Sequence, residues 1–317
     1  MPLPAFQEGY TGAVNEITIG GGGRTKTVTV GGARTIPHGG GRAATGRRPV
    51  IAMDVHDVGP EDWPEALAEP LASVLGDPAA WAKKCVEECG AELVCLKFHG
   101  IHPDKGDRDA AHAVGVTRKV LRAVGVPVAL WGSGSAEKDN AVMPKVSEAA
   151  KGEKALVGTV TQDNYKSLTA VALADGHFLI AEAPLDINIA KQTSILVSDM
   201  GYPLERLVMY QATGCLGYGL EYTYSLQERQ RLAALGADKL MAQPMIANVG
   251  HESWRAKEAK ATAVDAPAWG DARRRGPLWE AVTAVALIQS GADILVMTHP
   301  AAVATVREYI DQVWGTA

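Results

Sequence analysis

Cysteine is scarce in this sequence, with four residues in 317 and no pair in the C-x-x-C spacing. Four dispersed thiols are too few for a disulfide scaffold, and a metal or iron–sulfur site requires thiolates that are more closely spaced. We therefore expect no metal and no iron–sulfur cluster in this chain. Cys215 is the one thiol for which exposure is plausible, because it lies in a glycine-rich segment.

The sequence also lacks an excess of basic residues and any long apolar run. Lysine and arginine number 31 against 36 acidic residues, a net charge of −5, which argues against binding to nucleic acid. No stretch approaches the roughly 18 consecutive apolar residues of a membrane span. Residues 1–10 lack a basic start followed by an apolar stretch, so no signal peptide is visible. We expect a cytoplasmic protein that binds neither nucleic acid nor membrane.

From residue 49 onward, one unit repeats: a short apolar run, a polar loop, an amphipathic helix and a glycine that ends the helix. Eight such units with continuous apolar strands predict an α/β fold of the closed (β/α)8 TIM-barrel type over residues 49–317, with an open doubly wound sheet as the alternative. The eight predicted strands are Val50–Asp54, Leu93–His99, Val126–Trp131, Ala155–Thr159, Phe178–Glu182, Leu207–Gln211, Lys239–Gln243 and Ile294–Thr298.

Residues 1–48 differ from this pattern. Two alternating stretches, at 13–19 and 25–30, are separated by glycines, which predicts an N-terminal β-hairpin or meander. These glycines do not stand between a buried strand and a helix start, so they do not form a phosphate loop.

In a barrel, active sites gather where the strands end. The polar residues at those points form no recognised catalytic motif, and we assign no catalytic residue. Asp54 and Glu182 either face each other as an acid/base pair or cap neighbouring elements, and both alternatives remain open.

Three strand-to-helix loops are long, covering about residues 56–76, 212–224 and 247–276. The second reads A-T-G-C-L-G-Y-G-L-E-Y-T-Y-S from Ala212, and Ser225 with Glu228 predicts the start of the next helix. Its glycines allow close backbone approach and its tyrosines offer flat apolar faces. This favours a large flat ligand or a protein partner over a loop that only seals the barrel.

Several long segments resemble the small subunit of the corrinoid iron–sulfur protein, equivalently the delta subunit family of acetyl-CoA decarbonylase/synthase complexes. They include the Ala212 loop, I-H-P-D-K-G-D-R-D from Ile101, T-Q-D-N-Y-K-S-L from Thr161, P-M-I-A-N-V-G-H-E-S-W-R from Pro244 and W-G-D-A-R-R-R-G-P-L-W from Trp269. The resemblance runs through nearly the whole chain. Cys215 departs from it, since a small alanine-like residue is expected there.

The resemblance implies a barrel that pairs with a large corrinoid iron–sulfur subunit and covers one face of a corrinoid. The cofactor would accept a methyl group from methyltetrahydrofolate, held by a separate methyltransferase, and pass it to carbon monoxide dehydrogenase/acetyl-CoA synthase in the reductive acetyl-CoA pathway. We expect the corrinoid to be bound by the loop residues Thr213, Gly214, Gly217, Tyr218, Gly219 and Tyr222, and by Gln211, Gln243, Asn248 and His299.

Two other functions remain open. The chain would act as a stand-alone methyltransferase if its own barrel bound a pterin through Asp54, Asn164 or Glu182. It would be a purely structural subunit if it docked to a partner without touching a cofactor.

Overall fold

A computed structural model of the chain describes residues 9–37 and 46–315. Eight parallel strands close into a barrel in the order β10-β3-β4-β5-β6-β7-β8-β9, which confirms the predicted TIM-barrel fold. These strands are β3 (Val50–His56), β4 (Leu93–Lys97), β5 (Val128–Trp131), β6 (Leu156–Val160), β7 (Phe178–Ala183), β8 (Leu207–Gln211), β9 (Met245–Ala247) and β10 (Ile294–Met297).

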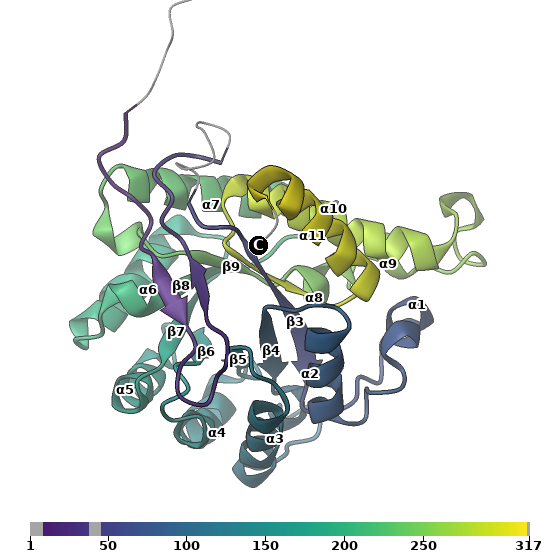
Figure 1. The fold of residues 1–317 in the computed structure, drawn as a ribbon, viewed down its shortest axis with the longest axis horizontal. Helices are drawn as coiled ribbons and strands as arrows, with labels where there is room; N and C mark the ends of the chain where they lie inside the picture. Colours follow the sequence, from purple (N-terminus) through teal and green to yellow (C-terminus); the bar gives the residue numbers. More distant parts are fainter. Residues whose placement is uncertain (1–8, 38–45, 316–317) are drawn as a thin grey trace, which may run out of the picture.

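Helices surround the barrel (Figure 1). The longer ones are α2 (Pro78–Glu87), α3 (Ala110–Ala123), α4 (Ala136–Ala149), α5 (Tyr165–Asp175), α6 (Ile187–Asp199), α7 (Leu220–Leu235), α10 (Ala272–Ser290) and α11 (Pro300–Trp314). Short helices α1 (Glu65–Ala68), α8 (Val249–Ser253) and α9 (Lys257–Lys260) lie in the long loops. Within the described residues, none of the helices is long and apolar enough to cross a membrane.

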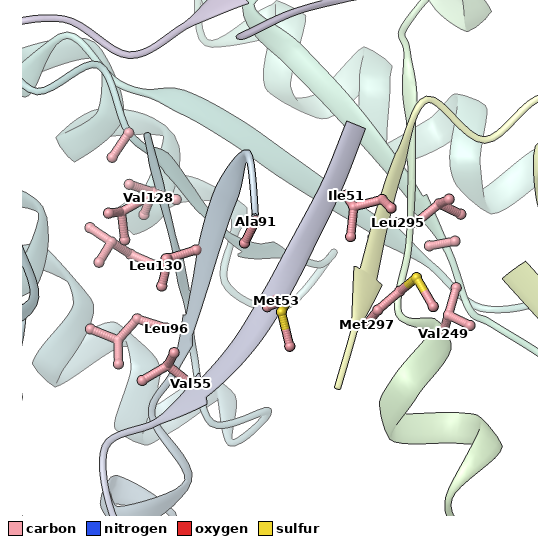
Figure 2. Close-up of a cluster of buried hydrophobic side chains, with 14 of the residues drawn as sticks. Ile51, Met53, Val55, Ala91, Leu96, Val128, Leu130, Val249, Leu295 and Met297 are labelled. Carbon is pink, nitrogen blue, oxygen red and sulfur yellow. The ribbon is translucent and has the colours of Figure 1, made fainter. Parts of the chain in front are cut away.

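Alternate strand residues face the helices and build the larger core. Ile51 and Met53 of β3 lie beside Leu295 and Met297 of β10, with which they pair in register (Figure 2). All four side chains are fully buried. Because successive strand residues point to opposite faces, the residues between them face the barrel interior.

The N-terminal hairpin closes the end of the barrel at which the strands begin, which we call the lower end. Strands β1 (Ile17–Ile19) and β2 (Val28–Val30) pair antiparallel, as predicted. Their four buried side chains, Ile17, Ile19, Val28 and Val30, belong to one apolar cluster with the inward residues of the barrel strands, among them Val50, Leu93 and Ile294. These three residues stand at the starts of their strands, so the hairpin seals the N-terminal end of the barrel.

The seventh predicted barrel strand was wrong. Lys239–Met241 is a 3-10 turn whose N-cap, Asp238, accepts a hydrogen bond from the Leu240 amide at 3.0 Å. The strand is β9, which follows Pro244. The apolar residues of the turn resemble those of a strand, but the Asp238 side chain stabilises a turn before the chain can extend.

The predicted start of the helix after β8 was also wrong. Helix α7 begins at Leu220, after Gly219, rather than at Ser225. Tyr222 therefore stands on the first turns of a helix instead of in a loop.

Candidate functional site at the barrel mouth

A buried ion pair occupies the barrel interior at its C-terminal end. Lys97, at the end of β4, lies 2.8 Å from Asp54 Oδ1 of β3 and donates a hydrogen bond to Asp54 Oδ2 at 3.0 Å. The Lys97 ammonium also donates to Asn248 Oδ1 at 2.6 Å, and Thr298 Oγ1 donates to Asp54 Oδ2 at 3.0 Å. Asp54 and Lys97 are each only 2% exposed. Such a pair tolerates burial because each charge has several partners.

Aromatic side chains fill the space beside this ion pair. Trp131 of β5 and Tyr210 of β8 meet edge to face with ring centroids 4.9 Å apart, and the Lys97 ammonium lies 5.6 Å from the Trp131 ring. Glu182 of β7 accepts a hydrogen bond from Thr159, and burial raises the pKa of its carboxyl. Asp54 and Glu182 thus each have a separate partner, so the structure does not pair them with each other.

A cavity of about 480 Å³ opens above Asp54 and Thr298. We call it the mouth cavity. Its walls come from the loops that follow β3, β4 and β9, and they include His56, Trp63, His99, Lys105, Arg108, His251, Trp254, Arg255 and Lys260. It therefore lies where barrel proteins place their binding sites.

The three histidines of the mouth cavity are uncharged at neutral pH. Burial, with the nearby positive charge of Lys97, lowers the pKa of His99 to about 3 and that of His251 to about 2. Burial also holds the pKa of His56 well below its usual range. The His56 and His99 rings lie 4.3 Å apart, centroid to centroid, and His56 also contacts Trp63 at 5.2 Å.

The imidazoles of His56 and His99 form no hydrogen bond to any residue that the structure describes, and the buried Nε2 of His99 lacks a partner. His56 is only 7% exposed. Buried polar groups in native proteins nearly always have a hydrogen-bond partner. A neutral imidazole offers one donor and one acceptor, so these two rings suit uncharged polar groups of a ligand, while charged side chains such as Lys105 and Arg108 line other parts of the cavity.

One buried carboxylate fixes the far wall of this cavity. Glu280 of α10 is fully buried and accepts hydrogen bonds from Trp254 Nε1 at 2.6 Å, the Thr298 amide at 2.6 Å and the His299 amide at 3.2 Å. Burial raises the pKa of this carboxyl to about 7. Trp254 in turn stacks on His299 at 5.7 Å. Glu280 thereby ties α8, β10 and α11 together at the mouth.

The glycine-rich loop after β8 lies beside the mouth and exposes tyrosines. Tyr218 is 51% exposed and Tyr222 is 62% exposed. Gly217 and Gly219 have positive φ values of 76° and 86°. A side chain on Gly214 would meet the carbonyl of Gly219 at 2.2 Å. The close approach at Gly214 is therefore an internal contact of the loop.

Three of the other predicted site residues face the mouth but already have partners. Thr213 Oγ1 accepts a hydrogen bond from the Asn248 amide at 2.9 Å, and Asn248 Oδ1 holds Lys97. His299 caps α11, since its Nδ1 accepts from the Ala301 amide at 3.0 Å. Burial lowers the pKa of His299 to about 4.

Gln211 and Gln243 point away from the mouth. Gln211 Nε2 donates to Gln230 Oε1 of α7 at 2.9 Å, between barrel and helix. Gln243 precedes β9, at the opposite end of the barrel, and its Nε2 donates to the Leu240 carbonyl at 3.0 Å. Cys215 is 3% exposed and packs against Leu67 and Trp254, so the expected exposure of its thiol was wrong.

Sequence reasoning missed Lys97 and Glu280. Lys97 follows Leu93 and Cys95 at two-residue spacing, so strand alternation alone would have placed its charge inside the barrel. The apolar residues around Glu280 do not mark the buried face of its helix, since Leu278 and Val282 are 55% and 48% exposed. Among the described residues, no group of three or more His, Cys, Asp or Glu side chains is arranged to hold a metal ion.

Similar folds occur among pterin-pathway enzymes. Dihydropteroate synthase from Xanthomonas albilineans superimposes with a TM-score of 0.57 over 85% of this chain and 95% of that one, at 14% identity. The Thermus thermophilus enzyme gives 0.56 over 93% and 98%, at 15% identity. At this identity the likeness shows the fold alone.

Other proteins are more similar to this chain in sequence. Acetyl-CoA decarbonylase/synthase complex subunit delta of Archaeoglobus fulgidus is 35% identical over 98% of this chain and 70% of its own length. The Methanopyrus kandleri subunit is 35% identical over 95% and 75%. Residues 16–308 match the family described as CO dehydrogenase/acetyl-CoA synthase delta subunit. The chain therefore belongs to the delta subunit family of the acetyl-CoA decarbonylase/synthase complex.

Proposed function

We propose that this chain is the small subunit of a heterodimeric corrinoid iron–sulfur methyl carrier, with the barrel mouth covering the corrinoid. Its partners are a large corrinoid iron–sulfur subunit, a methyltetrahydrofolate methyltransferase and carbon monoxide dehydrogenase/acetyl-CoA synthase, all in the cytoplasm. Membership of the delta subunit family supports a role as one subunit of a larger assembly.

The observation that carries the cofactor proposal is the buried Nε2 of His99, which has no hydrogen-bond partner among the described residues and lies next to the His56 ring in an open cavity beside exposed tyrosines. A corrin is a broad apolar ring edged with carboxamides, which need both donors and acceptors. Neutral imidazoles supply both, and the half-exposed faces of Tyr218 and Tyr222 supply apolar cover. The described residues therefore fit the group.

When bound, the corrinoid supplies the cobalt that carries the methyl group. The residues of this chain hold and shield it. The Lys97–Asp54 pair makes a rigid floor, Glu280 fixes Trp254 in the wall, and the tyrosines limit the access of water and oxidants. We assign no catalytic residue of this chain to the transfer and no metal ligand to its side chains.

A stand-alone pterin-binding methyltransferase remains the second candidate, because the fold resembles that of dihydropteroate synthases. The partners that Asp54 and Glu182 already have weigh against it. Asp54 is bound to Lys97 and Thr298, and Glu182 accepts a hydrogen bond from Thr159, so a pterin would have to displace these contacts. Asn164, the other residue considered for this role, bonds to the Thr159 carbonyl at 2.9 Å and to the Thr161 amide at 2.7 Å.

The test uses the heterodimer, produced by co-expression with the corrinoid-binding subunit under anaerobic conditions. Tyr218→Ala and Tyr222→Ala should each accelerate air oxidation of the reduced corrinoid, followed by its visible spectrum. The control is Leu232→Ala, a 42% exposed residue farther along α7. All three side chains are largely exposed, so the melting temperatures should change little. Equal oxidation rates in the three variants and the unmodified protein would contradict corrinoid cover.

The isolated chain provides a second measurement. With methyltetrahydrofolate and free cobalamin it should transfer no methyl group, and after anaerobic purification it should be colourless and free of stoichiometric iron. Methyl transfer by the chain alone would favour the pterin-dependent enzyme instead.

A further inference from the structure

The segment after α8 forms a projection at the rim of the mouth. We call residues 255–275 the basic arm; it contains α9, the loop after it and the first turn of α10. In Figure 1 it extends to the right-hand edge of the molecule, beyond the ring of helices. The arm follows β9, so it borders the same end of the barrel as the mouth cavity. Two of its residues, Arg255 and Lys260, also line that cavity.

A single guanidinium holds the arm in shape. Arg275 donates hydrogen bonds to four backbone carbonyls, those of Glu258, Ala261, Trp269 and Gly270, the last two at 3.0 and 2.8 Å. Arg273 ties the arm to the neighbouring loop through Glu65 at 2.9 Å and Glu69 at 3.2 Å. These contacts restrain the exposed loop, and restraint before binding reduces the entropy lost when a partner binds.

This fixed loop displays large apolar side chains. Val264 is 91% exposed and Trp269 is 42% exposed. Two cations lie over the Trp269 ring, with Lys257 Nζ and the Arg275 guanidinium each 5.8 Å from its centroid. Tryptophan and arginine are the residues that most often dominate the energy of protein interfaces.

The charge of the arm is opposite to that of the whole chain. Residues 255–275 hold six basic and three acidic residues, a net charge of +3, whereas the chain carries −5. Arg255 is paired with Glu252, Arg273 with Glu65 and Glu69, and Arg275 donates to backbone carbonyls. Within the described residues, the cations of the arm without an ion pair or a hydrogen bond are therefore Lys257, Lys260 and Arg274. Arg274 is exposed, and its guanidinium has no hydrogen bond or ion pair to any residue that the structure describes. This free cation, with those beside it, attracts a surface of the opposite sign.

We propose that the basic arm docks onto the corrinoid-binding subunit next to the barrel mouth. The surface that it contacts would be acidic and would have a recess for an aromatic side chain. This inference rests on the proposed function and names the chemistry of the partner. The acidic groups would surround the positions of Lys257 and Arg274, and an apolar recess would receive the Trp269 ring. Charge would then select the partner and Trp269 would hold it.

The experiment measures binding of the full chain to the purified corrinoid-binding subunit by calorimetry and stopped-flow mixing at several salt concentrations. The charge variant is K257E/R274E, and the contact variant is Trp269→Ala. The matched control is R118E/R122E, two exposed arginines on α3 with no ion pair to the described residues. The melting temperature of each variant reports whether it folds.

K257E/R274E should slow association and weaken binding at least about tenfold at low salt, with the difference shrinking as salt rises. Trp269→Ala should weaken binding about 30-fold, mainly by faster dissociation. R118E/R122E should change the affinity by less than about twofold, because screening limits the effect of charges far from an interface.

Normal binding by folded K257E/R274E and Trp269→Ala would overturn the arm proposal and leave corrinoid cover standing. The arm proposal is equally overturned if these variants bind the subunit normally but lose binding to anionic vesicles or to RNA, since the arm would then serve another partner. If the unmodified chain fails to bind the corrinoid-binding subunit, both proposals fall.

Discussion

At the N-terminal end of the barrel, the hairpin residues Ile17, Ile19, Val28 and Val30 pack against apolar strand residues in a buried cluster. At the mouth, the same strands end in a buried lysine, a buried aspartate and His99, whose buried Nε2 has no partner among the described residues. Apolar contacts at the lower end stabilise the fold without directional requirements. Buried polar groups at the mouth cost stability wherever their bonds are incomplete, which indicates that the mouth is kept for binding.

The largest expected effect comes from breaking the ion pair at the mouth. Lys97→Met leaves Asp54 buried without its cation, and we expect a loss of about 3 to 5 kcal/mol in the free energy of unfolding. Denaturant unfolding measures it. The double variant with Asp54→Leu removes both charges and should regain most of the loss. A single variant as stable as the unmodified chain would show that Asp54 needs no cation.

The lower end should respond to loss of apolar volume alone. Ile19 is fully buried, so Ile19→Ala should lower the free energy of unfolding by about 3 kcal/mol, with no change in partner affinity. Thr18→Ala, at the exposed neighbouring position, is the control and should cost under about 0.5 kcal/mol. Weaker partner binding in folded Ile19→Ala would show that the two ends are coupled.

Glu280, at the mouth, should make the free energy of unfolding depend on pH. Its pKa of about 7 in the folded state lies above the ordinary 4.5, so the folded state binds the proton more tightly between these values. This contribution is fully present below pH 4.5 and is lost as pH rises through 7, by about 3 kcal/mol at most. Glu280→Gln should remove that slope, measured by unfolding between pH 5 and 8, whatever its effect on overall stability. An unchanged slope would assign the pH dependence to other groups.

The smallest effect is expected at an imidazole without a partner. His56→Leu removes a buried polar group that has no hydrogen bond within the described residues, so the free energy of unfolding should stay within about 1 kcal/mol. Corrinoid retention by the heterodimer should nevertheless fall. A large loss of stability would mean that the rings of Trp63 and Trp81, which His56 contacts at 5.2 Å, depend on it.

The barrel was predictable from sequence because each strand is a short apolar run that ends near a polar residue. The exception, β9, has only three residues and follows a turn of similar composition, so periodicity could not separate them. For helix α10, the apolar residues do not reveal which face is buried. Its buried face includes Glu280 and Thr283, polar residues that an apolar stripe cannot reveal, while Leu278 and Val282 face outward.

The site was predictable only in outline. The loop with Tyr218 and Tyr222 was located from its glycines and tyrosines, and whether it touches a corrinoid remains a prediction. The mouth cavity itself was not predicted, since its walls come from three loops that are far apart in sequence. Which of their side chains stay without partners depends on tertiary packing, which spacing along the chain does not encode.

The hairpin covers the N-terminal end of the barrel, which leaves the mouth cavity at the opposite end. Gly20 packs against Pro127, and Arg24 donates to the carbonyls of Leu121 and Val124 at 2.5 Å, so the base is fastened to the barrel wall. A partner bound at the mouth would then cover the other end of the barrel, and a small molecule held between the two would exchange when that contact opens.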